Sequence, residues 1–156
     1  MKTNTIDIML TFRDRFVRLV KLYAELENKP RSFGTEELLT GTEIHLIETI
    51  GEKQESLSVT DLAGIMGVTK GAVSQNLKRL EQKSLTYKEE DPQNASRSIV
   101  KLTSKGKAAF YSHMHWHEVL DGEYLRYLEA LGEEKVEFLL EFMLNAEKLL
   151  SRIVSG

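Results

Sequence analysis

The chain has 156 residues, of which 41% are hydrophobic and 29% are charged, and its formal net charge is −3 at pH 7. This is enough apolar material for a hydrophobic core, so a soluble globular chain of one domain is expected. The sequence has no cysteine, which excludes disulfides, thiolate catalysis and cysteine-type zinc sites. No apolar run approaches the roughly 20 residues of a membrane span and no signal peptide is visible, which predicts a cytoplasmic protein without a membrane partner.

Charge is unevenly distributed along the chain. Residues 1–68 carry eight basic and eleven acidic side chains, residues 69–107 carry nine and four, and residues 108–156 carry four and nine. The middle segment is therefore a basic island in an acidic chain. Because charge interactions are screened beyond roughly 10 Å at physiological salt, a local patch of this kind is enough to attract nucleic-acid phosphates.

Helical periodicity predicts two helices in the first third of the chain. The first is amphipathic and covers residues 5–27. The connection that follows it is expected to contain a turn of helix within residues 34–39. Thr40 and Glu43 have the spacing of a capping box, which predicts that the second helix covers residues 40–51.

Residues 58–87 are typical of two short helices joined by a tight turn. Ser58 and Asp61 resemble a capping box at the first helix, Gly67 ends it, and Thr69 caps the second. The polar face of the second helix carries short or basic side chains: Thr69, Lys70, Gly71, Ser74, Gln75, Asn76, Lys78 and Arg79. Because amides and hydroxyls read base edges while lysines contact phosphates, this helix is predicted to lie in the DNA major groove. An ordinary helical hairpin with a solvated polar face is the alternative.

The rest of the chain predicts a hairpin followed by two long helices. Residues 85–88 and 98–102 are expected to be strands of a β-wing around a polar loop. The helices then cover about 104–131 and 132–153, and the second has an apolar surface wider than one neighbouring helix covers, which predicts a subunit interface. The expected fold class is mostly α with a small two-stranded β-wing, combining a winged helix-turn-helix lobe and a helical dimerisation region.

Three segments of the sequence resemble the MarR family of transcriptional regulators, in the order in which that family carries them. They are LTGTEIHLIETIG, LSVTDLAGIMGVTKGAVSQNLKRLEQKSLTYKEEDP and VKLTSKGKAAF. The resemblance implies a single domain, 1–156, in which 34–103 form the DNA-binding lobe while 1–33 and 104–156 form the dimerisation region. It also implies a homodimer, a ligand-responsive repressor rather than an enzyme, whose two lobes bind a palindromic operator in double-stranded DNA.

The sequence departs from the family pattern at two positions. Ser84 stands where members often carry glycine at the end of the recognition helix, and a left-handed turn there would cost serine about 1 kcal/mol relative to glycine. Arg97 follows the wing loop one place later than the arginine of the family motif. The resemblance still assigns Arg97 a DNA contact in the minor groove.

Three of the four histidines fall within residues 113–117. His113 and His117 are i, i+4 neighbours on one helix face, whereas His115 points to the opposite face. Likeness to zinc-sensing MarR members of the AdcR and ZitR kind implies that His113 and His117, with Glu27 and His45, bind Zn²⁺. Three nitrogens and one oxygen suit that ion without cysteine. MarR repressors of the FabT kind also carry the three histidines, so these alone do not discriminate.

Two other interpretations of this region stay open. A fatty-acyl or small aromatic effector would occupy a pocket lined by Phe16, Tyr23, Phe33, Phe110, Met114 and Trp116. Alternatively, the histidines are structural and are hydrogen-bonded to carboxylates. A zinc-dependent hydrolase with Glu118 or Glu27 as base is a remote alternative, because four protein ligands leave no open metal position.

Overall fold

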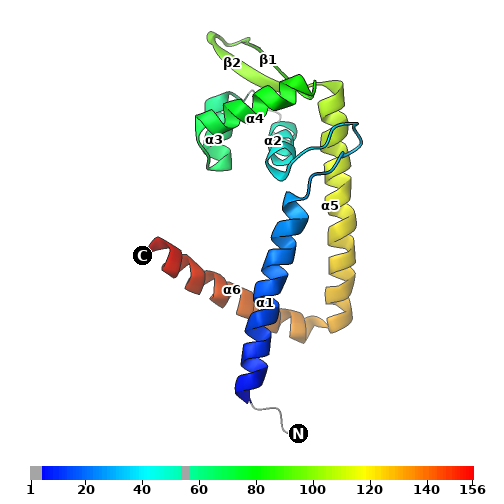
Figure 1. Cartoon of the computed structure of the whole chain (residues 1–156), viewed down its shortest axis with the longest axis vertical. Coiled ribbons are helices and arrows are strands. Elements are labelled where there is room, and N and C mark those ends of the chain that lie inside the picture. Colours follow the sequence, from blue (N-terminus) through cyan, green and yellow to red (C-terminus); the bar gives the residue numbers. More distant parts are fainter. Residues whose placement is uncertain (1–4, 54–56) are drawn as a thin grey trace. The chain divides into compact units, whose positions relative to one another are not determined.

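The computed structural model describes residues 5–53 and 57–156, and Figure 1 shows the order of their elements. The elements are α1 (Thr5–Asn28), α2 (Gly41–Glu52), α3 (Val59–Met66), α4 (Lys70–Gln82), β1 (Thr86–Asp91), β2 (Asn94–Leu102), α5 (Ser104–Leu131) and α6 (Glu133–Ser155). The chain forms two compact units, Met1–His113 and Met114–Gly156, so α5 begins in the first and ends in the second. The described residues are mostly helical and include an antiparallel two-stranded sheet, which confirms the predicted fold class.

Local signals place the helices of the first unit. The Thr40 hydroxyl accepts a hydrogen bond from the Glu43 N–H, and the Glu43 carboxylate accepts one from the Thr40 N–H, which confirms the capping box at α2. Ser58 and Asp61 form the same reciprocal pair at α3. Helix α3 ends at Gly67, whose φ of 65° is a left-handed conformation that glycine adopts without strain.

The core of the first unit lies between α2, α3, α4, the sheet and the start of α5. Its buried side chains include Ile44, Ile47, Leu62, Leu77, Leu80, Ile99 and Ala109. Helix α5 begins directly against the backbone that leads into β1, because a Cβ on Gly106 would lie 2.0 Å from the Leu85 carbonyl oxygen. The recognition helix, the wing and the first turns of α5 are therefore held by one core.

The wing is an antiparallel hairpin whose strands are longer than the predicted 85–88 and 98–102. Its register runs from Thr86 opposite Leu102 to Asp91 opposite Asn94, with an irregularity between Glu90 and Asp91. Several of the added residues, such as Glu89, Glu90 and Ser96, are exposed on the strands. They lack the apolar alternation of a half-buried strand, so the sequence pattern does not mark them.

The connection between α1 and α2 forms no helical turn within residues 31–39, so the expectation for 34–39 is wrong. Arg31 and Leu39 instead pair as an isolated antiparallel bridge, with N···O distances of 3.1 and 2.8 Å. Between them Phe33 and Gly34 both have positive φ, 42° and 71°. Phe33 is also buried, and since this backbone conformation costs a non-glycine residue about 1–3 kcal/mol, its packing must stabilise it.

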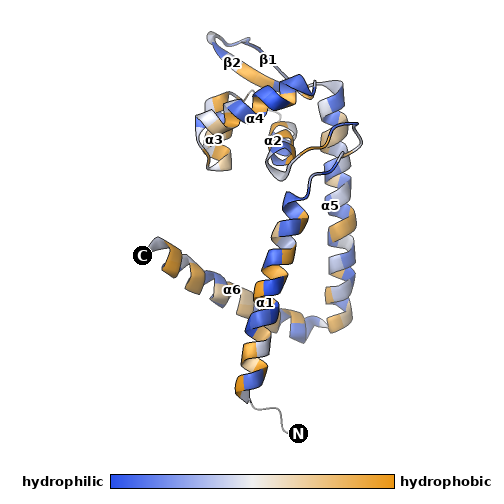
Figure 2. Cartoon of the chain, in the orientation of Figure 1, coloured by the Kyte–Doolittle hydropathy of each residue, from blue (hydrophilic) through white to orange (hydrophobic). Residues whose placement is uncertain are grey.

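Helices α1 and α6 bury no residue of their described lengths. Figure 2 shows apolar residues along both helices, interspersed with hydrophilic ones. The exposed large side chains include Ile6, Met9, Leu19 and Tyr23 on α1, and Phe138, Leu140, Leu150 and Ile153 on α6. Large exposed apolar surfaces mark sites of protein interaction. Among the described residues, no helix is long and apolar enough to cross a membrane.

Candidate functional site

The predicted DNA-reading side chains lie on α4 and its N-cap residue. Thr69 caps the helix by accepting a hydrogen bond from the Ala72 N–H at 3.2 Å. On the opposite face Val73, Leu77 and Leu80 are buried in the core. The predicted set is exposed to solvent except for Asn76, whose side-chain amide donates to the Ala72 carbonyl at 3.0 Å. The core therefore holds one face of α4 and leaves the polar and basic face accessible.

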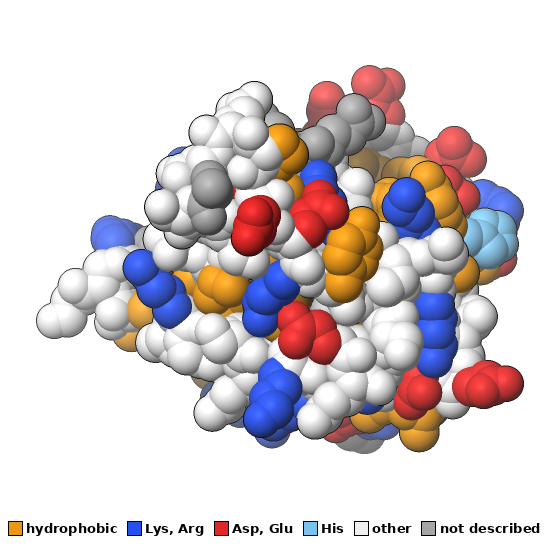
Figure 3. Space-filling view, turned by 90° about the horizontal axis from the view of Figure 1, so that it is seen from above, with side chains coloured by type: hydrophobic (Ala, Val, Ile, Leu, Met, Phe, Trp, Pro, Cys, Tyr) orange, Lys and Arg blue, Asp and Glu red, His pale blue; other side chains and the backbone are white. Residues whose placement is uncertain are grey.

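The surface around α4 and the wing carries charges of both signs. Figure 3 shows Lys and Arg side chains spread over this side of the chain, with Asp and Glu side chains among them.

Ser84, just beyond the end of α4, has a φ of 58°, which confirms the left-handed turn considered for this position. The turn lets the chain leave α4 and enter β1, so the wing follows the recognition helix directly.

A buried ion pair joins the end of α4 to the start of α2. Lys83, the C-cap residue of α4, places Nζ 2.9 Å from both carboxylate oxygens of Glu43 and donates to the Leu38 carbonyl at 2.9 Å. The Glu43 side chain is only 2% exposed. Burial alone would raise the pKa of Glu43, but hydrogen bonds from Lys83 and Thr40 and the ammonium charge lower it below its ordinary value. The ionised carboxylate thus holds two elements together.

Arg97 ties the wing to α3. Its two terminal nitrogens contact the carboxylates of Asp61, on α3, and Asp91, at the end of β1. Hydrogen bonds from the hydroxyl and N–H of Ser58, together with Arg97, lower the pKa of Asp61 to about 2, and the pKa of Arg97 is raised in turn, chiefly by Asp61. The assignment of Arg97 to the minor groove stays a prediction, because here its guanidinium faces these two carboxylates.

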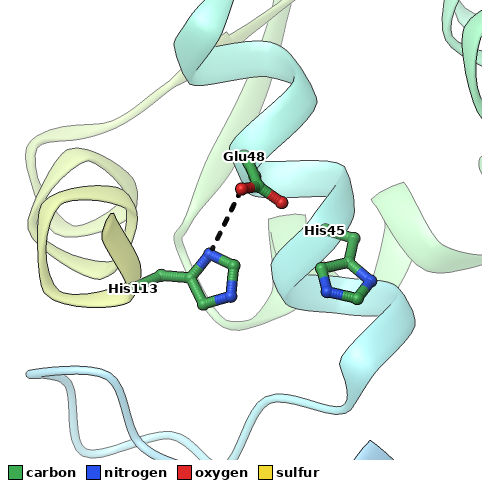
Figure 4. A group of neighbouring side chains, drawn as sticks. All are labelled: His45, Glu48 and His113. Carbon is green, nitrogen blue, oxygen red and sulfur yellow. Dashed lines mark ion pairs between the residues drawn. The ribbon is translucent and has the colours of Figure 1, made fainter. Parts of the chain in front are cut away.

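His45 and Glu48 of α2 and His113 of α5 lie side by side, as Figure 4 shows. One ligand atom from each lies within 4.8 Å of the other two. The His45 and His113 ring centroids are 5.7 Å apart, and His113 Nδ1 lies 3.9 Å from Glu48 Oε1. His113 is buried, while the other two are half-buried. These separations bring three potential ligand atoms close to the spacing that a single metal ion requires.

The other two predicted ligands are Glu27 and His117. Glu27 Oε2 lies 3.2 Å from His45 Nε2, so the end of α1 reaches this cluster. His117 belongs to the second unit, where its ring contacts Trp116 with centroids 4.8 Å apart, and its participation in the site stays a prediction. The His115 side chain is 76% exposed and lies 3.4 Å from Glu118, consistent with its place on the opposite face of α5.

Glu48 is the residue of the cluster that sequence reasoning misses. Its spacing from His45, i, i+3, places both on one face of α2 and is the available sequence signal. Spacing within α2 does not show that His113, 65 positions after Glu48, packs against this face. Phe33 also packs there, with its ring edge-on to His113 at a centroid distance of 4.9 Å and an interplanar angle of 88°.

The residues of the predicted effector pocket are distributed over several elements. Phe16 stacks on Phe12 within α1, with centroids 6.4 Å apart, and Tyr23 is exposed. Phe33 and Phe110 lie in the first unit, against His113 and Gly51 respectively. Met114 and Trp116 belong to the second unit. A single pocket made by all six residues therefore stays a prediction.

Comparison with known proteins finds similarity to one family of regulators. The sequence model of the MarR family matches residues 39–97, which include α2, α3, α4 and most of the wing. The chain is 26% identical over 145 residues to the uncharacterized HTH-type transcriptional regulator YhjH of Bacillus subtilis, covering 92% of this chain and 78% of that protein. It is 26% identical over 133 residues to the transcriptional regulator AdcR of Streptococcus pyogenes, covering 83% and 88%. These matches support a MarR-family winged helix-turn-helix transcriptional regulator that binds DNA and is not an enzyme, as predicted.

Two solved structures show that the MarR fold extends over most of the chain. The zinc-responsive MarR family member ZitR of Lactococcus lactis superposes with a TM-score of 0.75 at 17% identity, covering 91% of this chain and 99% of that one. FabT of Streptococcus pneumoniae, solved in complex with DNA, gives a TM-score of 0.66 at 18% identity, covering 96% and 99%. These likenesses confirm the predicted winged helix-turn-helix architecture.

Proposed function

We propose that this MarR-family protein is a homodimeric repressor that binds a palindromic operator and responds to Zn²⁺ held by the histidine and glutamate cluster. The observation that carries the proposal is the double role of α2. His45 and Glu48 of this helix lie in the cluster, while its Glu43 forms the buried ion pair with Lys83 at the end of α4. One helix thus connects a metal-compatible site to the recognition helix.

The DNA part of the proposal is supported by the accessible face of α4. Gln75 is exposed and presents a side-chain amide, which can pair with the edge of a base, and the exposed Lys78 presents a cation suited to a phosphate. The unburied apolar faces of α1 and α6 favour a second copy of the chain as partner. A dimer with two-fold symmetry presents two identical recognition helices, which is the reason to expect a palindromic operator.

The chemistry of the cluster fits Zn²⁺. Imidazole nitrogen and carboxylate oxygen are both common zinc ligands, and Zn–N and Zn–O bonds of about 2.0–2.2 Å in a tetrahedral site place ligand atoms about 3.4 Å apart. The observed limit of 4.8 Å therefore requires the side chains to close by roughly 1 Å, which rotamer adjustment can supply. Glu27 and His117 are the candidates for completing the ligand set, with Glu27 already 3.2 Å from His45.

Zn²⁺, when bound, supplies coordination bonds between α2 and α5. The chain's own contacts then relate α2 to α4, because Glu43 is fixed by its own capping box and holds Lys83 through both carboxylate oxygens. A shift of α2 would therefore displace the end of the recognition helix. The effect on DNA affinity is bounded by the difference in zinc affinity between the two arrangements, commonly about 1–3 kcal/mol.

The test couples metal binding to DNA binding in one set of variants. The operator would first be obtained by selecting a random duplex library with the wild-type dimer in the presence of Zn²⁺. His113→Ala is expected to lower zinc affinity by about tenfold to a hundredfold. It should also abolish the zinc dependence of operator binding. His115→Ala is the matched control, since its side chain is 76% exposed, and should change neither. Calorimetry and mobility shifts with and without zinc measure the two effects.

The pH dependence of zinc binding gives a second check. Protonated imidazole cannot ligate, so zinc affinity should fall as the pH falls through the histidine range near about 6.5. Purified protein that takes up no zinc at neutral pH, or a His113→Ala variant with a wild-type zinc response, would contradict the metal part of the proposal. The fatty-acyl or aromatic effector would then replace Zn²⁺ while the DNA-binding part stands.

The roles of the two glutamates can also be separated. If Glu48 ligates the metal and Glu27 accepts a hydrogen bond from the other His45 nitrogen, Glu48→Gln should lower zinc affinity more than Glu27→Gln. A glutamine at position 27 keeps a carbonyl oxygen that can accept this hydrogen bond. The reverse order of the two effects would make Glu27 the ligand.

A further inference from the structure

Gly71 lies in the first turn of α4, where the fold of the chain gives no reason for a glycine. Its φ is not positive, unlike that of Gly67, so its backbone conformation is open to any residue. A Cβ at Gly71 would have its nearest neighbour, the Thr69 Oγ1 atom, at 3.9 Å, which is an ordinary van der Waals distance. At Gly106, by contrast, a Cβ would lie 2.0 Å from a carbonyl oxygen. Packing among the described residues therefore explains Gly106 and leaves Gly71 unexplained.

A glycine at this place also makes the helix less stable. Glycine loses more conformational freedom on folding than alanine does, which raises the unfolding equilibrium constant by about two- to fivefold. Gly71 is exposed, and the described residues around it would accommodate an alanine methyl group. A destabilising residue without a role in the fold indicates that the missing side chain serves a contact with another molecule.

Gly71 begins an exposed stripe along α4 whose side chains become longer towards the end of the helix. Ser74, Gln75 and Lys78 follow it at i+3, i+4 and i+7, so the four residues share one face, and all four are exposed. The side chain is absent at Gly71, is a single hydroxymethyl group at Ser74 and is a long ammonium chain at Lys78. This gradient allows the first turn of α4 to approach a surface more closely than its later turns.

We propose that Gly71 lets the first turn of α4 reach the floor of the DNA major groove, with the helix backbone against base edges of the operator. The inference rests on the proposed placement of α4 in that groove. The groove is about 12 Å wide and a helix with its side chains is about 10–12 Å across, so side-chain bulk at the entering end limits how deep the helix can lie. Ser74 supports a deep position, because a hydroxyl on one carbon reaches a base only if the backbone itself comes close.

The test relates the size of residue 71 to operator affinity. Gly71→Ala should weaken binding to the selected operator by about tenfold, which corresponds to one weakened base contact, and Gly71→Leu by about a hundredfold. Binding to a scrambled duplex should change by less than about twofold, because non-specific binding depends on phosphate contacts. Both variants should raise the urea midpoint of unfolding, since alanine and leucine favour a helix more than glycine does. Mobility shifts and urea denaturation measure the two effects.

Gly64→Ala is the matched control, because Gly64 is an exposed glycine of α3 whose Cβ would meet nothing within 4 Å. This variant should also raise the urea midpoint, and it should leave operator affinity unchanged. Operator affinity of Gly71→Ala within about twofold of wild type, or an equal loss in Gly64→Ala, would overturn the proposal. An equal loss on operator and scrambled duplex would overturn it too, because the close contact would then be with phosphates. A lower urea midpoint in Gly71→Ala would show a role for this glycine within the chain and have the same consequence.

The result can be told apart from a failure of the groove placement itself. If α4 does not lie in the groove, Gln75→Ala and Lys78→Ala also leave operator binding unchanged. If α4 lies in the groove and only the inference about Gly71 is wrong, those two variants weaken binding while Gly71→Ala does not.

Discussion

The winged lobe and the two terminal helices bury very different shares of their residues. Helix α2 buries six of its 12 residues, whereas α1 buries none of 24 and α6 none of 23. Both kinds of helix are amphipathic in sequence, so amphipathicity alone does not show which apolar face is covered within the chain. The difference indicates that the lobe is ordered by its own core, and that α1 and α6 need a partner to cover their apolar faces.

The largest effect is expected from placing charge on the uncovered surface of α6. Leu139 and Met143 are apolar side chains of this helix, 37% and 48% exposed in the single chain. Replacing both with glutamate would bury unpaired carboxylates in the proposed dimer interface and cost about 3–5 kcal/mol, so the dimer and DNA binding should be lost together. Sedimentation velocity and a mobility-shift assay would measure the two losses.

Lys135→Glu, an exposed charge change on the same helix, is the control and should leave both measurements unchanged. The lobe of the double variant should keep its fold, because its core does not include α6 residues. A wild-type protein that sediments as a monomer at micromolar concentration would contradict the conclusion that α1 and α6 need a partner to cover their apolar faces.

The second largest effect concerns the buried ion pair within the lobe. Lys83→Met would leave the Glu43 carboxylate buried without its ammonium partner, which should destabilise the protein by about 3–5 kcal/mol in urea unfolding. Adding Glu43→Gln should recover part of this loss, because the buried charge is removed while a capping acceptor remains.

Lys105→Met gives the matched comparison. The pair that Lys105 forms with Glu37 is more than one-third exposed on both sides, so its loss should cost less than about 1 kcal/mol. Equal destabilisation by Lys83→Met and Lys105→Met would show that the buried pair does not hold α4 to α2.

Two substitutions on the exposed face of α4 should have smaller and distinguishable effects. Gln75→Ala removes a proposed base contact and should relax sequence preference by about 1–3 kcal/mol. Lys78→Ala removes a proposed phosphate contact and should weaken binding to all sequences alike, while reducing the salt slope by about one unit. Binding constants for the selected operator and a scrambled duplex at several salt concentrations separate the two. Unchanged operator binding by both variants at low salt would place α4 outside the groove.

Sequence reasoning succeeds where a feature is encoded locally. The capping boxes at Thr40 and Ser58 and the apolar face of α4 depend on residues a few positions apart, and the structure has them as predicted. The extended wing strands escape notice because their added residues, such as Glu89, Glu90 and Ser96, lack the apolar alternation that marks a half-buried strand. The strained Phe33 turn escapes notice because nothing in its local sequence requires a positive φ.

The candidate site could be predicted from the sequence only in part, because some of its contacts join residues far apart in the chain. His45 and His113 could be proposed from the family resemblance, and the structure places their rings 5.7 Å apart. The Glu43–Lys83 pair joins residues 40 positions apart, and Arg97 joins Asp61 across 36 positions. Such contacts depend on how the elements pack, which neither periodicity nor local spacing reveals.

The smallest predicted effect comes from Asp61, which links α3 to the wing through Arg97. The pKa of Asp61, about 2, lies below its ordinary value of 3.8, so the folded state favours the ionised carboxylate. Its contribution to stability is therefore fully present above about pH 4 and is lost as the pH falls towards about 2. Because the side chain is 39% exposed, solvent screening reduces the contribution to about 1 kcal/mol.

Asp61→Asn should lower stability by this amount at neutral pH and flatten the pH dependence of urea unfolding between about pH 4 and pH 2. Asp14→Asn is the control, because Asp14 and its partner Arg13 on α1 are both largely exposed, and it should leave that pH dependence intact. An acid limb that is identical in wild type and Asp61→Asn would show that the Asp61–Arg97 link adds nothing to the lobe. If only Asp61→Asn flattens the pH dependence of the free energy of unfolding between about pH 4 and pH 2, that loss of stability in acid comes from the contact between α3 and the wing. It would then belong to the lobe rather than to the terminal helices.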